Sequence, residues 1–131
     1  MESTLRRTWA DIDLDAIAHN YKLIRQKIGS DVKFLGVVKA DAYGHGSVML
    51  APTLLASGAD MLGVASIDEG VDLRQAKIDC DILVLGAVPV WAVETAVNYD
   101  LIISIFSKPL FNIIFAITTK KFHNIYLIKK F

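Results

Sequence analysis

The stretch Phe34-Leu35-Gly36-Val37-Val38 decides the fold, because it is short, continuous and apolar. Such a run is typical of a strand buried in a parallel sheet. Three more apolar runs follow, at 61–65, 82–85 and 101–105, and helical sequence separates the runs over 47–57, 66–76 and 91–99. Repeated strand–helix units predict an α/β protein with a parallel sheet and right-handed crossovers.

This pattern leaves two architectures open. A doubly wound sheet and an eight-stranded barrel both alternate strands with helices. Four strands would make half of a barrel, with two open sheet edges that a complete barrel does not have.

The sequence before the first apolar run predicts a strand and then a helix. Residues 8–14 alternate polar and apolar side chains, as a half-buried strand does. Apolar side chains then recur at helical spacing, at Ile17, Tyr21, Ile24 and Ile28. Asp13 or Asp15 can cap the start of this helix, and Gly29 can close its end.

Two later helices carry their own signals. Ser66 and Glu69 have the spacing of a capping box, which predicts a helix running toward Ala76. The helix over 47–57 ends before Gly58 and contains Pro52, which removes one helical hydrogen bond.

Length and composition exclude several classes of protein. The 131 residues fit one modest domain, and a hydrophobic content of 53% is far too high for a disordered chain. A formal net charge of zero does not favour a nucleic-acid partner, which needs clustered positive charge. No Cys/His cluster has metal-ligand spacing, and one cysteine, Cys80, indicates a reduced compartment and hence a cytoplasmic protein.

The net charge of zero hides two unlike parts. Residues 1–107 hold all 14 acids and nine bases, giving −5, whereas 108–131 hold five lysines and no acid, giving +5. Four of the six phenylalanines also lie in 108–131. We therefore predict a domain over 1–107 and, over 108–131, a short irregular or helical tail that is not native to it. Such a Lys-, Ile-, Phe- and Asn-rich tail is what an A/T-rich reading frame gives when it is translated out of register.

Two other interpretations of the tail stay open. It can be the genuine but divergent end of the domain, or an amphipathic segment that lies on a membrane surface. The sequence does not favour a membrane partner, because isoleucines crowd both sides of the helical pattern. A spanning helix needs about 20 mainly apolar residues, and Lys108-Pro109 and Lys120-Lys121 interrupt the run.

The residues best placed for chemistry follow the first apolar run. Function in β/α proteins concentrates at the carboxyl ends of the strands, and Lys39 is the first charged residue there. Partial desolvation at this position favours the neutral amine, which can attack a carbonyl; alternatively, the side chain simply reaches into solvent. Tyr43 adds a hydroxyl, and His45 is either a general base or an ordinary loop histidine. Cys80 is excluded as a nucleophile, because its acidic neighbours do not stabilise a thiolate.

The ten residues from Val37 to Gly46, Val-Val-Lys-Ala-Asp-Ala-Tyr-Gly-His-Gly, closely resemble the cofactor-lysine signature of alanine racemases. The segments 9–20, 64–70 and 82–86 are also similar to that family, in unbroken order. The resemblance covers about residues 8–105 and implies the first half of a (β/α)8 TIM-type barrel, truncated to roughly a third of the family's length.

The resemblance implies a site and a reaction. In this family pyridoxal 5'-phosphate forms a Schiff base with the lysine that matches Lys39, and that lysine exchanges the α-proton of alanine. The tyrosine matching Tyr43 hydrogen-bonds the phosphate, and the residues matching Val37 and Leu85 line the cofactor ring. The second base is a tyrosine of the partner subunit, so the full-length family is homodimeric.

The function implied is the interconversion of L-alanine and D-alanine, which supplies D-alanine for peptidoglycan. As a truncated fragment, the chain is expected to be inactive alone. The alternatives are a non-enzymatic truncated fragment and a related racemase or decarboxylase of the same fold type that acts on another amino acid.

Overall fold

The computed structural model describes residues 8–118 and 125–127. Within these residues, five strands form one parallel sheet in the order of the sequence. The strands are β1 (Leu35–Val37), β2 (Met61–Val64), β3 (Asp81–Val84), β4 (Ile102–Ile105) and β5 (Ile125–Leu127). Four of them correspond to the four predicted apolar runs, which confirms the α/β class with a parallel sheet.

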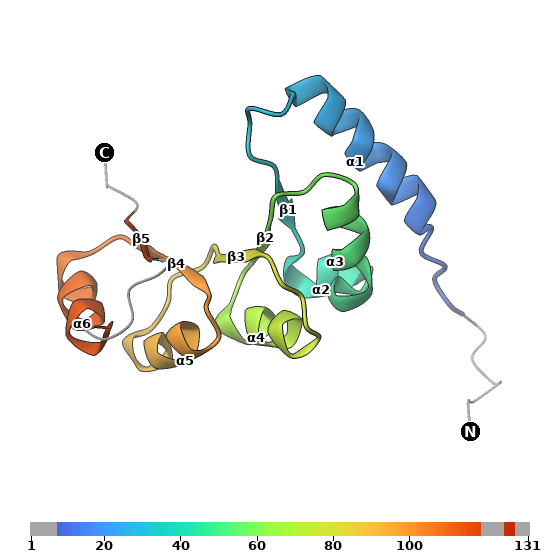
Figure 1. Cartoon of the computed structure of the whole chain (residues 1–131). Coiled ribbons are helices and arrows are strands. Elements are labelled where there is room, and N and C mark those ends of the chain that lie inside the picture. The colour runs from blue at the N-terminus through green and yellow to red at the C-terminus, as the bar shows by residue number, and fades with distance from the viewer. Residues whose placement is uncertain (1–7, 119–124, 128–131) are drawn as a thin grey trace.

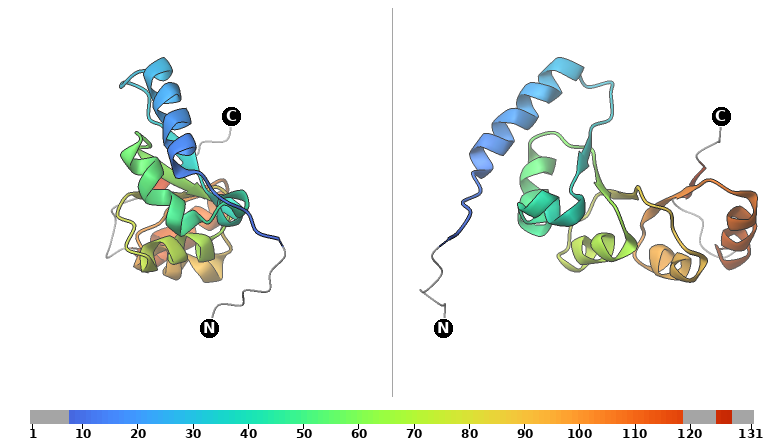
Figure 2. Two further views of the ribbon diagram at one scale, coloured as in Figure 1. Left: turned by 90° about the vertical axis from the view of Figure 1, so that its right-hand side faces the viewer. Right: turned by 180° about the vertical axis from the view of Figure 1, so that it is seen from behind.

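Helical segments precede β1 and connect the strands, and those after β1 lie along one side of the sheet (Figures 1 and 2). They are α1 (Leu14–Ile28), α2 (Lys39–Gly44), α3 (Ser47–Ala56), α4 (Ile67–Gln75), the 3₁₀ turn η1 (Val90–Ala92), α5 (Val93–Asn98) and α6 (Lys108–Thr118). The ribbons of α3 to α6 lie along the convex side of a curved sheet (Figure 1). A doubly wound sheet reverses its strand order and carries helices on both faces. The observed sheet keeps its strands in the order of the sequence and carries these helices on one face, so the chain is part of a barrel.

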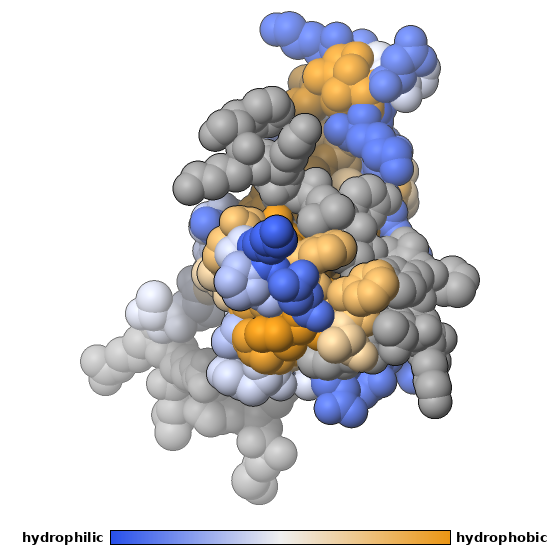
Figure 3. Space-filling view, turned by 90° about the vertical axis from the view of Figure 1, so that its left-hand side faces the viewer, coloured by the Kyte–Doolittle hydropathy of each residue, from blue (hydrophilic) through white to orange (hydrophobic). Residues whose placement is uncertain are grey.

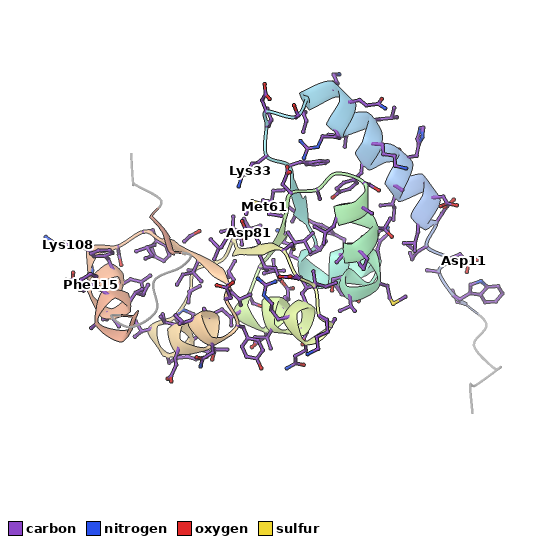
Figure 4. All side chains as sticks on the ribbon, viewed as in Figure 1. Asp11, Lys33, Met61, Asp81, Lys108 and Phe115 are labelled. Carbon is purple, nitrogen blue, oxygen red and sulfur yellow. The ribbon has the colours of Figure 1, made fainter. Side chains whose placement is uncertain are left out.

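The two faces of the sheet differ in burial. Leu62, Val64 and Ile82 have no exposed surface and pack into the core beneath the helices. The residues that alternate with them, such as Val37 and Leu83, face the other way and are only partly buried. Met61 and Asp81 lie on this concave side, away from α4 and α5 (Figure 4). Each continuous apolar run thus supplies side chains to both faces of the sheet: one set packs beneath the helices, and the other lies on the concave face.

The predicted strand over residues 8–14 is wrong. Residues 8–13 form no regular structure and are exposed, with Trp9 at 74%. The aspartates that produce the alternation have local partners: Asp13 Oδ1 accepts from the Ala16 N–H at 3.0 Å and caps α1, and Asp11 accepts from the Trp9 indole at 3.3 Å. The alternation therefore reflects a helix start.

The helix signals are otherwise confirmed. Gly29 ends α1 with a φ of +79°, a conformation that glycine adopts readily. Ser66 and Glu69 form the expected reciprocal capping box at the start of α4. Pro52 lies inside α3, as the sequence indicates.

Arg25 ties α1 to the amino end of the sheet. Its Nε donates to the Gly58 carbonyl at 3.0 Å, its Nη1 donates to the Val32 carbonyl at 2.7 Å, and its Nη2 pairs with the Asp60 carboxylate. The N–H of Phe34 also donates to Asp60, at 2.6 Å. The Phe34 N–H and the Arg25 guanidinium lower the pKa of Asp60 from its ordinary value. This cluster fixes the start of β1, at the amino end of the sheet. A functional site is expected at the other end, where the strands have their carboxyl ends.

The segment after Ser107 is ordered in part. Leu110 and Ile114 of α6 are buried, whereas Phe111, Ile113 and Phe115 are 37%, 37% and 51% exposed. Apolar and polar side chains therefore share the surface at the α6 end of the molecule (Figure 3). β5 extends the sheet by pairing parallel with β4. The rest of the predicted tail, 119–124 and 128–131, lies outside the described residues, and its foreign origin stays a prediction.

None of the helices in the described ranges is both long enough and apolar enough to cross a membrane.

Candidate functional site

Lys39 lies at the carboxyl end of β1, where the sequence places it. Val38, just before it, is 1% exposed, and its N–H donates to the Gly63 carbonyl at 2.8 Å. The backbone is therefore held by β2 up to the residue before Lys39. Lys39 itself is partly buried and is the first residue of α2.

The backbone after Lys39 makes an unusual left-handed turn. Residues 40–43 have φ values of +51° to +56° and ψ values of +37° to +49°. The Ala42 N–H donates to the Val38 carbonyl at 2.9 Å, which closes the turn onto the end of β1. For residues other than glycine, such helical geometry costs about 1–2 kcal/mol per residue. Strained backbone of this kind persists only where surrounding contacts hold it, and it gathers at functional sites.

Two carboxylates hold this turn. The Ala40 N–H donates to Glu69 Oε1 at 2.7 Å, which links the turn to α4. The Ser47 N–H donates to Asp41 Oδ1 at 2.7 Å, which links the turn to the start of α3. The sequence predicts a loop over this stretch and only a capping role for Glu69. The Ser66–Glu69 spacing is the one signal that pointed to Glu69, and it says nothing about Ala40.

The other three predicted cofactor residues lie at the same end of the sheet. Val37 is level with Gly63 and, across β2, with Leu83. Leu85 follows β3, is 43% exposed, and lies two residues beyond Leu83, so it shares the concave face with Val37. Tyr43 ends the left-handed turn and is 62% exposed.

These residues are a suitable set for a flat cofactor that carries an aldehyde and a phosphate. Lys39 offers a primary amine, Tyr43 an accessible hydroxyl, and Val37 and Leu85 apolar surface. Gly63 lies between Val37 and Leu83, and the Leu35 side chain packs against it. Pyridoxal 5'-phosphate is such a cofactor, and the donor set fits it.

His45 and Cys80, the other residues considered for chemistry, contribute no reactive group. In the tautomer with a proton on Nδ1, His45 donates to the Ala42 carbonyl at 2.9 Å, so it braces the turn. Burial raises the pKa of the Cys80 thiol, which agrees with its exclusion as a nucleophile. Among residues 8–118 and 125–127, no group of His, Cys, Asp and Glu side chains could hold a metal ion.

A separate hollow of about 250 Å³ lies between the start of α4 and the segment from β3 to α5. Its lining includes Ser66, Val88, Trp91 and Thr95, but none of Lys39, Tyr43, Val37 and Leu85. The four predicted residues lie instead at the carboxyl ends of β1 and β3, on the concave face, so we place the candidate site there and not in this hollow.

The sequential parallel sheet, its one-sided helices and the lysine turn at the carboxyl end of β1 define the class as part of a β/α-barrel domain. The family model "Alanine racemase, N-terminal domain" matches residues 12–127. The chain belongs to this family.

Three known proteins show the extent of the similarity. Alanine racemase 1 of Clostridium acetobutylicum is 48% identical over 103 residues, which are 79% of this chain and 26% of that protein. The alanine racemase of Bacillus anthracis with bound L-Ala-P has a TM-score of 0.80 and 40% identity over 85% of this chain and 29% of that one. The histidine racemase of Leuconostoc mesenteroides has a TM-score of 0.72 and 25% identity over 82% of this chain and 28% of that one.

The chain thus spans about a quarter of the length of the curated alanine racemase that it matches. Its similarity extends to racemases of two different amino acids, so the fold by itself does not select the substrate.

Proposed function

We propose that this chain carries the cofactor-lysine portion of a pyridoxal-phosphate-dependent racemase that interconverts L-alanine and D-alanine. The observation that carries the proposal is the position of Lys39, at the carboxyl end of β1 and at the head of a left-handed turn that two carboxylates hold. Alanine is favoured over other amino acids because the 48% identical relative is an alanine racemase, whereas the histidine racemase is 25% identical.

Each residue of the site has a proposed task. Lys39 Nζ would hold the cofactor through its aldehyde and, once the amino group of the substrate takes the aldehyde in its place, the freed amine would hold and return the α-proton on one face of the substrate. The Tyr43 hydroxyl donates to the cofactor phosphate, and Val37 and Leu85 contact the ring. When bound, pyridoxal 5'-phosphate withdraws electrons from the α-carbon of an amino acid and so makes its proton easier to remove.

Racemisation needs a second base on the opposite face, and Lys39 serves only one. The resemblance assigns that base to a tyrosine of a partner subunit, so we propose that the active form is a homodimer of longer subunits. Because the chain spans about a quarter of its relative, we expect it to bind the cofactor without racemising alanine.

The test is to identify the lysine that binds. The 131-residue chain is mixed with pyridoxal 5'-phosphate, reduced with borohydride, digested, and mapped by mass spectrometry. We expect the reduced cofactor on Lys39 alone; labelling spread over the lysines would contradict the site. In parallel, alanine racemisation is expected to stay at the rate of free pyridoxal 5'-phosphate. Turnover well above that rate would refute the expectation that the chain is inactive alone.

The role of Tyr43 makes a separate prediction. Tyr43→Phe removes the hydroxyl but keeps the ring, and one hydrogen bond at a 62% exposed side chain contributes about 1 kcal/mol. We therefore expect the affinity for pyridoxal 5'-phosphate to fall roughly fivefold, measured by spectroscopic titration. Pyridoxal, which lacks the phosphate, is the control ligand, and its affinity should not change. An equal loss with both aldehydes would show that Tyr43 acts elsewhere than on the phosphate.

A further inference from the structure

Glu69 makes more contacts than a helix cap requires. One oxygen, Oε2, accepts from the Ala65 N–H at 2.7 Å and from the Ser66 N–H at 3.4 Å. The other, Oε1, accepts from the Ala40 N–H at 2.7 Å. Glu69 thereby joins the end of β2 to the backbone that follows β1.

The Ala40 contact is not part of the capping box. A capping box satisfies orphan N–H groups of one helix start, and here Ser66 and Oε2 already complete it. Ala40 lies 29 residues earlier in the chain. The hydrogen bond from the Ala40 N–H to Oε1 is as short as that from the Ala65 N–H to Oε2. One carboxylate oxygen of Glu69 therefore binds the segment after β1, and the other binds the start of α4.

The peptide that receives this bond is the one between Lys39 and Ala40. Ala40 is also the first of the left-handed residues, with a φ of +51°. Its N–H lies shortly after the end of β1, where the chain enters the disfavoured left-handed conformation. An anchor at this point fixes the direction in which the chain leaves Lys39.

We propose that Glu69 is a positioning residue for Lys39: it holds the Lys39–Ala40 peptide and so keeps the amine at the mouth of the sheet, where the cofactor binds. This inference rests on the proposed function. Asp41 cannot take over this role. Its carboxylate accepts from the Ser47 N–H at the far side of the turn, whereas the Ala40 N–H donates to Glu69.

The first experiment needs no cofactor. Amide hydrogen exchange of the full chain is measured by NMR for the wild type, for Glu69→Gln and for Ser66→Ala. Ala40 is exposed and lies outside the sheet ladder, so protection of its amide in the wild type depends on Glu69. Glutamine has a single acceptor oxygen and cannot serve Ala40 and Ala65 together. We expect the glutamine oxygen to keep the local bond to Ala65, so exchange at the Ala40 amide should rise about tenfold, as for the loss of one charged hydrogen bond.

Ser66→Ala is the matched control, since it removes the Ser66 hydroxyl that accepts from the Glu69 N–H but leaves the carboxylate in place. It should loosen the start of α4 without changing exchange at Ala40. Equal effects of the two variants on Ala40 would overturn the proposal and leave Glu69 a cap only. A wild-type Ala40 amide that exchanges as fast as an unprotected one would also overturn it, even if Glu69→Gln does not fold.

The second experiment adds pyridoxal 5'-phosphate and compares borohydride trapping at Lys39. We expect about tenfold less adduct in Glu69→Gln at equal cofactor concentration, and wild-type trapping in Ser66→Ala. Equal trapping in all three proteins would refute the positioning role. If the wild type traps no cofactor on Lys39, the proposed function fails, and the exchange experiment still decides whether Glu69 holds the Lys39–Ala40 peptide.

Discussion

Replacement of Lys39 by arginine is expected to abolish the covalent capture of pyridoxal 5'-phosphate by this chain. Arginine keeps the positive charge and most of the side-chain length, but its guanidinium stays protonated and is not a nucleophile for an aldehyde. The loss should be complete at this position, because the variant carries no primary amine on the residue at the head of the left-handed turn. The measurement is absorbance of the chain with the cofactor, followed by borohydride reduction and mass spectrometry.

Lys33→Arg is the matched control for this result. Lys33 is exposed and lies before β1, at the amino end of the sheet (Figure 4). This variant should capture the cofactor as the wild type does. Both variants should keep wild-type circular dichroism: substitutions at an exposed residue such as Lys33 usually change stability by less than about 0.5 kcal/mol, and Lys39→Arg keeps the charge and most of the length of a partly buried side chain. Undiminished capture by Lys39→Arg would remove the assigned site, whatever the family similarity.

Much of the fold follows from local sequence, because each βα unit has a strong local pattern. The runs 61–65 and 82–85 are apolar at every position or nearly so, and they become β2 and β3. The capping box at Ser66 fixes the start of α4 within the sequence itself. Strand period then places Val37 and Leu85 on one face, although neither residue is near the other in the chain.

Other features depend on contacts between distant segments, and sequence patterns do not contain them. The choice between a doubly wound sheet and a barrel depends on strand order, which only the assembled sheet shows. The left-handed turn is held from outside, by Glu69, and residues such as Ala40 and Tyr43 give no local sign of positive φ. The alternation over 8–14 was misleading because aspartates favour helix caps as well as exposed strand positions.

A methyl group at Gly86 is expected to destabilise the whole domain. A Cβ at this position would lie 2.3 Å from the Ala65 carbonyl oxygen, a separation that backbone movement alone can relieve. Ala65 has little freedom to move, because hydrogen bonds hold both sides of the peptide bond before it. Its own N–H donates to Glu69, and the carbonyl of the preceding residue, Val64, accepts from the Leu85 N–H at 2.8 Å. We expect Gly86→Ala to lower the free energy of unfolding by about 3 kcal/mol, the upper end for overpacked sites, out of a typical 5–15 kcal/mol.

Gly63→Ala is the comparison that isolates the steric cause. Gly63 is buried and lies on the neighbouring strand β2, but the atoms nearest to its Cβ would be side-chain atoms of Leu35, at an ordinary 3.4 Å. Urea unfolding followed by circular dichroism should therefore separate the two variants, with less than about 1 kcal/mol lost in Gly63→Ala. Because the Ala65 segment also binds Glu69, Gly86→Ala should weaken capture of the cofactor at Lys39 even where the protein is still folded. Equal midpoints for the two variants would mean that the ends of β2 and β3 are not held together as closely as the Ala65–Gly86 approach requires.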